Sequence, residues 1–281
     1  MKCWVMMFFL FLSAAVRAEV LFEDPTDRAL ITAFENLSEE EVKDVSGPSV
    51  GKKEYMLGFL YLNGDDQFNI EKDCQRAVSL LTNAWEKRIS DAGYLLATMY
   101  YHGVCADKDI DGARKLAAKA AQDGYILAQR MLGMAYLGKS WQELYEKDVD
   151  KAIYWLSKAG DAGDRVSAGQ LSYMYSNGVY VTQDKEESFI WLRKGIFNRY
   201  EEGRIASFPV LAETYEKGEG TEIDLIKAYK YYDLSGTAGV KAKQRISKQM
   251  TQEQIDEALR QSQAWQEEHN VQIGGGWIQY K

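Results

Sequence analysis

The sequence is poor in the residues on which common catalytic and metal sites depend. It has two histidines, His102 and His269, and three cysteines among 281 residues. A nucleophile needs a base within hydrogen-bonding reach, and two isolated histidines do not supply a triad. No CxxC or HExxH motif is present either. We therefore expect a protein that is not an enzyme and has no catalytic residues, metal ligands or cofactor.

Basic residues are in the minority, and long apolar runs are absent. Lysine and arginine number 34 against 42 acids, which gives a net charge of −8. Phosphate groups are bound by basic surfaces, so nucleic acid and anionic lipid are not expected partners. A membrane-spanning helix needs about 20 apolar residues, and no run approaches that length. Membrane insertion is therefore not expected.

The first eighteen residues, MKCWVMMFFLFLSAAVRA, have the composition of a secretory signal peptide. Lys2 forms a short positive region, an apolar run follows, and small residues lead to Ala18. Cleavage near Ala18 predicts a periplasmic or secreted protein with a net charge of −10 (32 minus 42). Cys74 and Cys105 then remain. An oxidising compartment favours one disulfide between them over the alternative of two free thiols.

One pattern recurs along the chain: Leu, three residues, Tyr, three residues, Gly. It occurs as LGFLYLNG at 57, LATMYYHG at 96, LSYMYSNG at 171 and LAETYEKG at 211. A fifth copy, LGMAYLGK at 132, has its glycine one residue earlier. The spacing of roughly 36 to 40 residues is that of a helical repeat.

A second pattern follows each copy of the first. Counted from an Asp, a small residue follows at position +4, a large apolar residue at +7 and another small residue at +11. These offsets define one face of an α-helix, and the Asp is placed to cap its first amides. The predicted caps are Asp73, Asp109, Asp148, Asp184 and Asp224.

With LGxxYxxG in the first helix and AxxWLxKA, residues 152–159, in the second, the repeats resemble the Sel1-like repeat family, a relative of the tetratricopeptide repeats. The closing MTQEQIDEA, residues 250–258, is similar to the end of many bacterial members. The resemblance covers roughly residues 53–265. It implies an all-α, right-handed α-solenoid of about five two-helix repeats with N- and C-terminal capping helices.

The ends of the array carry their own signals. Residues 38–41 have the form of a capping box flanked by Leu37 and Val42, and Thr251 and Gln254 form a second box. The run after residue 270 has three consecutive glycines and no helical period, which favours a flexible tail over the alternative that Trp277 and Tyr280 dock on the array. The predicted segments are a signal peptide (1–18), an N-terminal cap (19–52), five repeats (53–249), a C-terminal capping helix (250–269) and a flexible tail (270–281).

A partner surface is expected on the first helix of each repeat. At 100° per residue, positions two before, two after and five after the repeat Leu point away from the packing face, where superhelical repeats line their concave groove. The alternative is that the N-terminal cap or a preceding repeat covers some of them. The predicted surface comprises Tyr55, Phe59, Leu62, Tyr94, Thr98, Tyr101, Arg130, Met134, Leu137, Tyr173, Glu213 and Glu216.

These features favour an exported, non-enzymatic scaffold that binds another protein through an aromatic and aliphatic groove. His102 occupies a helix-end position at which the other copies have unrelated residues, so no functional role is expected for it. The resemblance implies more specific roles. We favour an immunity protein that neutralises a type VI secretion effector, because the chain is small and acidic. The alternatives are an adaptor for envelope or polysaccharide assembly or signalling, and a β-lactam-binding or hydrolysing member, although those carry a cysteine pair in nearly every repeat.

Overall fold

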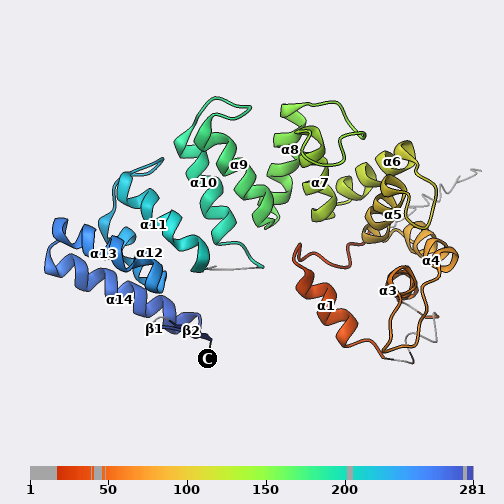
Figure 1. Cartoon of the computed structure of the whole chain (residues 1–281), viewed down its shortest axis with the longest axis horizontal. Helices are drawn as coiled ribbons and strands as arrows, with labels where there is room; N and C mark the ends of the chain where they lie inside the picture. Colours follow the sequence, from red (N-terminus) through yellow and green to blue (C-terminus); the bar gives the residue numbers. More distant parts are fainter. Residues whose placement is uncertain are drawn as a thin grey trace, which may run out of the picture.

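The structure, a computed structural model, describes residues 18–38, 40, 46–47, 49–200, 205–274 and 277–280. All of the predicted signal peptide except Ala18 lies outside these residues, as do Glu41 and Val42 of the predicted N-terminal capping box. Figure 1 shows the described helices arranged along an arc, with α1 (Asp27–Glu35) on its inner side near α3. The all-α solenoid that the repeats predict is confirmed.

Five helix pairs build the array. They are α3 (Val50–Asn63) with α4 (Cys74–Glu86), α5 (Ser90–His102) with α6 (Ile110–Gln122), α7 (Ile126–Tyr136) with α8 (Val149–Asp161), α9 (Arg165–Asn177) with α10 (Lys185–Ile196), and α11 (Phe208–Lys217) with α12 (Leu225–Leu234). Each second helix also packs against the first helix of the next repeat. This junction is sparsest between α10 and α11, where the 3₁₀ turn η1 (Ile205–Ser207) precedes α11.

The helix ends follow the local sequence. All five predicted Asp caps are confirmed, since each carboxylate accepts the backbone N–H three residues on, at 2.9–3.0 Å. At the other end, Gly103 and Gly178 take left-handed conformations with φ of 67° and 65° and end α5 and α9. Glycine adopts this conformation without the steric cost that a side chain carries.

Small residues hold neighbouring helices close together. Ala77, Ala113, Ala152 and Ala228 are fully buried, as expected for the small positions of the second helices. Gly133 on α7 approaches α8 so closely that a Cβ there would lie 2.6 Å from Cγ of Leu156. The periodicity of small residues in the sequence therefore corresponds to helix contacts within and between repeats.

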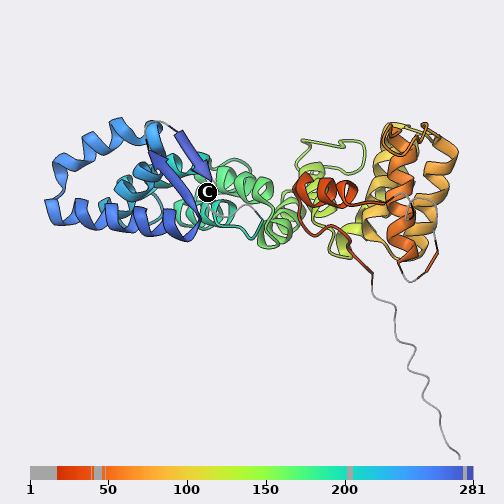
Figure 2. The ribbon, with the colours of Figure 1, turned by 90° about the horizontal axis from the view of Figure 1, so that it is seen from below.

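The C-terminal end closes the array with a helix and a hairpin. After η2 (Gly236–Gly239), α13 (Val240–Ile246) and η3 (Ser247–Gln249), α14 (Gln252–Glu268) begins at the predicted capping box of Thr251 and Gln254, which is confirmed. Strands β1 (Val271–Gly274) and β2 (Trp277–Tyr280) then pair antiparallel beside α14 (Figure 2).

The hairpin corrects the prediction of a flexible tail. Val271 is buried, and Ile273 packs into the same cluster, which includes Trp265 of α14. The Ile273 amide also donates to the Gln266 side chain at 2.7 Å. Alternating apolar and polar residues give a strand one apolar face to bury. In so short a segment, this two-residue period is weak evidence for a strand.

The N-terminal segment contacts more of the array than the first repeat. Glu19 pairs with Ile89 in a parallel bridge, and the Asp91 carboxylate accepts the amides of Leu21 and Phe22 at 2.9 and 3.1 Å. Arg28 on α1 donates to the carbonyl of Tyr200, beyond α10, at 2.7 Å. The segment thus links the start of the second repeat to the end of the fourth.

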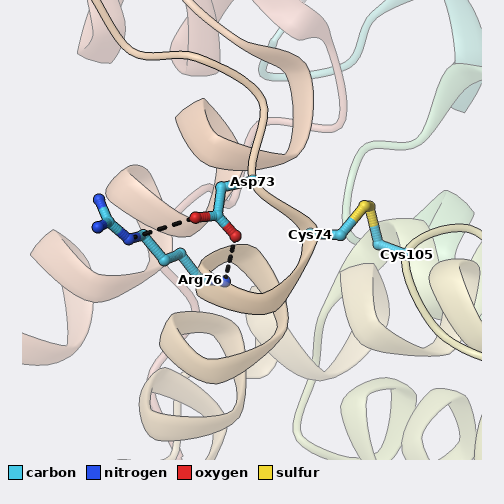
Figure 3. The surroundings of a disulfide bond; sticks show 4 residues. All are labelled: Asp73, Cys74, Arg76 and Cys105. Atoms are coloured by element: carbon cyan, nitrogen blue, oxygen red, sulfur yellow. Dashed lines mark hydrogen bonds and ion pairs between the residues drawn. A yellow bond between two sulfur atoms is a disulfide. The ribbon is translucent and has the colours of Figure 1, made fainter.

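The predicted disulfide between Cys74 and Cys105 is confirmed (Figure 3). Cys74 follows the cap residue Asp73 at the start of α4, and Cys105 lies just beyond α5, with 4.8 Å between the two Cα atoms. The bond closes a loop with a sequence separation of 31 residues. In the chain-entropy model a loop of this length contributes roughly 3 to 4 kcal/mol.

Candidate protein-binding surface

Two residues of the predicted surface are buried, which corrects their placement. Tyr55 is 4% exposed and lies against Phe22 of the N-terminal segment, with 5.8 Å between ring centroids. Leu137, at the end of α7, is 3% exposed and packs in a cluster with Leu156 and Leu171. A helical wheel treats a helix as having one packed side, whereas these helices have neighbours on several. The alternative of cover by the N-terminal cap is confirmed at Tyr55.

The other aromatic residues of the predicted surface in the first two repeats contact further rings of the chain. Phe59 lies against Phe34 of α1 at 5.0 Å, and Leu62 is half-buried in the same cluster. Trp141 stacks on Tyr101 at 4.7 Å, and its ring is parallel to that of Tyr94 at 6.1 Å. Burial raises the pKa of Tyr94 above its ordinary value. The predicted surface of the first three repeats is therefore largely filled.

Trp141 is the residue that repeat-based reasoning misses. It lies in the connection between Gly138 and Asp148, which has nine residues, whereas the connections in repeats two, four and five have five. Only the first repeat has a similar insertion, of eight residues between Gly64 and Asp73. The extra length of this connection and the aromatic residue within it are the sequence features that could have predicted that Trp141 covers the surface.

Several polar positions of the predicted surface already have partners within the chain. Arg130 forms an ion pair with the buried Asp164 at 3.0 Å, and the Thr98 hydroxyl donates to the Tyr94 carbonyl at 3.0 Å. Glu213 pairs with Lys217. Glu216 accepts hydrogen bonds from Tyr232 and Arg245, both at 2.8 Å. Met134 is half-buried in the cluster of Leu156 and Leu171.

Tyr173 on α9 is the large hydrophobic residue of the predicted surface that stays open. Its side chain is 52% exposed, and the nearby Lys139 ammonium lies 5.8 Å from its ring centroid. Val166, on the same helix face seven residues earlier, is 42% exposed, and Val210 on α11 is 54% exposed. We call these three exposed residues the open inner patch, after the inner position that the repeat pattern predicts for Tyr173.

The segment GMAYLGKS, residues 133–140, matches the spacing of a phosphate-binding loop. In such a loop, backbone amides outside regular structure cradle the phosphates. Here residues 133–136 belong to α7, so their amides take part in helical hydrogen bonds, and the Lys139 ammonium donates to Gln170 at 2.7 Å. The match therefore reflects the repeat motif and forms no phosphate cradle.

The described residues contain no group of three or more His, Cys, Asp or Glu side chains arranged to hold a metal ion. His102 is exposed at the end of α5, with its ring edge-on to Tyr101 at 4.9 Å. None of the described helices has both the length and the apolar character needed to cross a membrane.

A sequence model described as Sel1 repeat matches this chain five times, over residues 54–85, 90–125, 126–164, 167–196 and 210–240. Among solved structures, a Sel1 repeat protein from Oxalobacter formigenes is 22% identical with a TM-score of 0.58, covering 85% of this chain and 98% of that one. This likeness supports the fold.

Two further solved structures are more distant. A protective antigen of uropathogenic Escherichia coli with an SLR fold is 24% identical with a TM-score of 0.39, covering 82% of this chain and 57% of that one. The immunity protein Pa5087 from Pseudomonas aeruginosa is 18% identical with a TM-score of 0.41, covering 66% and 67%. At these TM-scores neither likeness bears on function.

Proposed function

Since this chain belongs to the Sel1 repeat family, we propose that it is a non-catalytic scaffold that binds another protein on the open inner patch. Helical solenoids present extended concave surfaces to their partners. The observation that carries the proposal is the half-exposed ring of Tyr173 on α9, at a position where the repeat pattern predicts the concave groove. Tyrosine offers a large, stiff contact area and is enriched among the residues that dominate binding energy.

We propose further that the partner is a toxin and that this chain is an exported immunity protein against a type VI secretion effector. The acidic net charge supports this, because it favours rapid association with a basic face on the toxin. The disulfide and the N-terminal segment also support it, since they hold the repeats together before binding. A pre-organised surface loses less conformational entropy on association, and tight inhibition requires this.

The binding surface can be tested with two matched tyrosines. Tyr173→Ala and Tyr154→Ala remove side chains that are both 52% exposed on helices, and Tyr154 lies on α8, the second helix of its repeat. In affinity capture from periplasmic extract with mass spectrometry, we expect Tyr173→Ala to weaken retention of the partner at least about tenfold. Tyr154→Ala should retain it. Equal capture by Tyr173→Ala and the unaltered protein would refute the patch.

The immunity role has a separate test. A strain that lacks this gene should be killed by kin cells that deliver the captured toxin, and the intact gene should restore survival. Survival without the gene would contradict the immunity role and leave the scaffold proposal in place.

A further inference from the structure

We propose a second binding site that takes an apolar side chain flanked by lysine or arginine in a segment of a partner protein. The site, called here the α1–α3 hollow, lies between α1, the end of α3 and the turn at residues 65–70. It has a volume of about 540 Å³ and is lined chiefly by Ile31, Phe34, Glu35, Phe59, Asp65 and Phe68. The inference rests on the proposed function because its ligand is part of a protein.

The first repeat builds one wall of the hollow with its longer connection. Asp65 and Ile70 exchange both backbone hydrogen bonds at 2.8 Å, which closes the turn. The Asp65 side chain also accepts the Phe68 amide at 3.0 Å and so fixes the turn beside that ring. The insertion relative to the short-connection repeats therefore forms a wall with an aromatic residue.

The interior is apolar. The Phe34 and Phe59 rings lie in contact, and the side chain of Leu60, 4% exposed, also lines the hollow. Ile31 on α1 is 53% exposed at its edge. Sites for small ligands and side chains are concave, mostly apolar and about 300 to 1,000 Å³ in volume. The hollow meets these conditions and leaves apolar surface open to solvent.

The charged residues that line the α1–α3 hollow indicate which ligand it fits. Glu35 and Asp65 are the charged residues that line the hollow, and both are acids. Another hollow beside α1 contrasts with it, because three basic residues, Arg28, Lys52 and Arg199, and a single acid, Asp24, line that one. A cation next to an apolar anchor would pair with the two carboxylates, whereas an acidic segment would be repelled. The site therefore fits a basic segment with an aromatic or aliphatic anchor.

Three acetylated tetrapeptides test this inference on the whole protein with ¹³C-labelled isoleucine methyl groups. Lys-Phe-Lys-Gly should shift the Ile31 methyl resonance in NMR and reach saturation, and the exposed Ile190 methyl should not move. Glu-Phe-Glu-Gly and Lys-Gly-Lys-Gly should leave Ile31 unchanged. An equal shift with the acidic peptide, or with the peptide that lacks phenylalanine, would overturn the proposal.

A pair of charge variants separates the hollow from general electrostatics. Glu35 and Glu86 are exposed glutamates at the last residues of α1 and α4, where lysine is tolerated because of the helix dipole. Glu35→Lys should weaken binding of Lys-Phe-Lys-Gly about fivefold, and Glu86→Lys should not. An equal effect of both variants, or no Ile31 shift with any peptide, would overturn the proposal that the hollow is a binding site. Continued capture of the partner through Tyr173 in that case would leave the proposed function standing.

Discussion

Asp91 is a buried acid that holds the N-terminal segment against the array. Burial raises its pKa to about 6, the amides of Leu21 and Phe22 act in the opposite direction, and the nearby Glu19 raises it further. Tyr55 and Tyr125 are the other titratable side chains that interact with it. Because the pKa is above that of the unfolded chain, near 3.9, the neutral acid is the form that stabilises the folded state.

This shift predicts a pH dependence of stability. The contribution of Asp91 is fully present below about pH 4 and is lost as the pH rises through about 6, by up to about 3 kcal/mol. Urea denaturation of Asp91→Asn between pH 4 and 7 should show a flatter profile than that of the unaltered protein. The slopes of stability against pH are compared, and not the absolute stabilities, because the asparagine side chain has one acceptor fewer than that of Asp91 at every pH. Parallel profiles would contradict the assignment.

At the scale of the helix, two glycines on the first helices of neighbouring repeats are expected to respond to alanine in opposite ways. A methyl group at Gly133 on α7 would meet Leu156 Cγ at 2.6 Å and its backbone N at 3.1 Å, whereas one at Gly169 on α9 meets nothing within 4 Å. Gly133→Ala should therefore lower the free energy of unfolding by about 1 to 3 kcal/mol. Gly169→Ala should raise it by about 0.5 to 1 kcal/mol through helix propensity. Urea denaturation measures both, and a stabilising Gly133→Ala would show that the α7–α8 contact is looser than described.

The helices could be predicted from the sequence because the residues that begin and end them act locally. The Asp caps and terminal glycines act within one helical turn, so their spacing places the helices. The hairpin was missed because its stabilising contacts are with α14 and the hydrophobic cluster around Trp265, and its short strands carry little periodic signal. In the candidate surface, Trp141 was missed because its insertion breaks the repeat that guided the alignment.

At the scale of the whole molecule, each repeat is stabilised mainly by its neighbours, so stability can differ along the array. The disulfide joins repeats one and two, and the α10–α11 junction is sparse. Replacing Cys74 and Cys105 by serine should cost roughly 3 to 4 kcal/mol in the N-terminal repeats. Hydrogen exchange should accelerate in α4 and α5 and stay unchanged in α11 and α12. Uniform acceleration would mean that the array unfolds as one unit, and reduction of the unaltered protein is the control.

The sequence by itself determined the repeat number, the helix ends and the buried small residues, because these depend on contacts within or between adjacent helices. It favoured a disulfide between Cys74 and Cys105 on the expected compartment alone, and the structure decided that the two are bridged. Only the tertiary structure decided which outward positions remain open. Phe22 covers Tyr55 and Trp141 covers Tyr101 from places in the chain that no periodicity connects to them. Tyr173 has no such cover and stays half exposed. A helical period specifies the direction of a side chain, but the path of distant segments decides whether a partner can reach it.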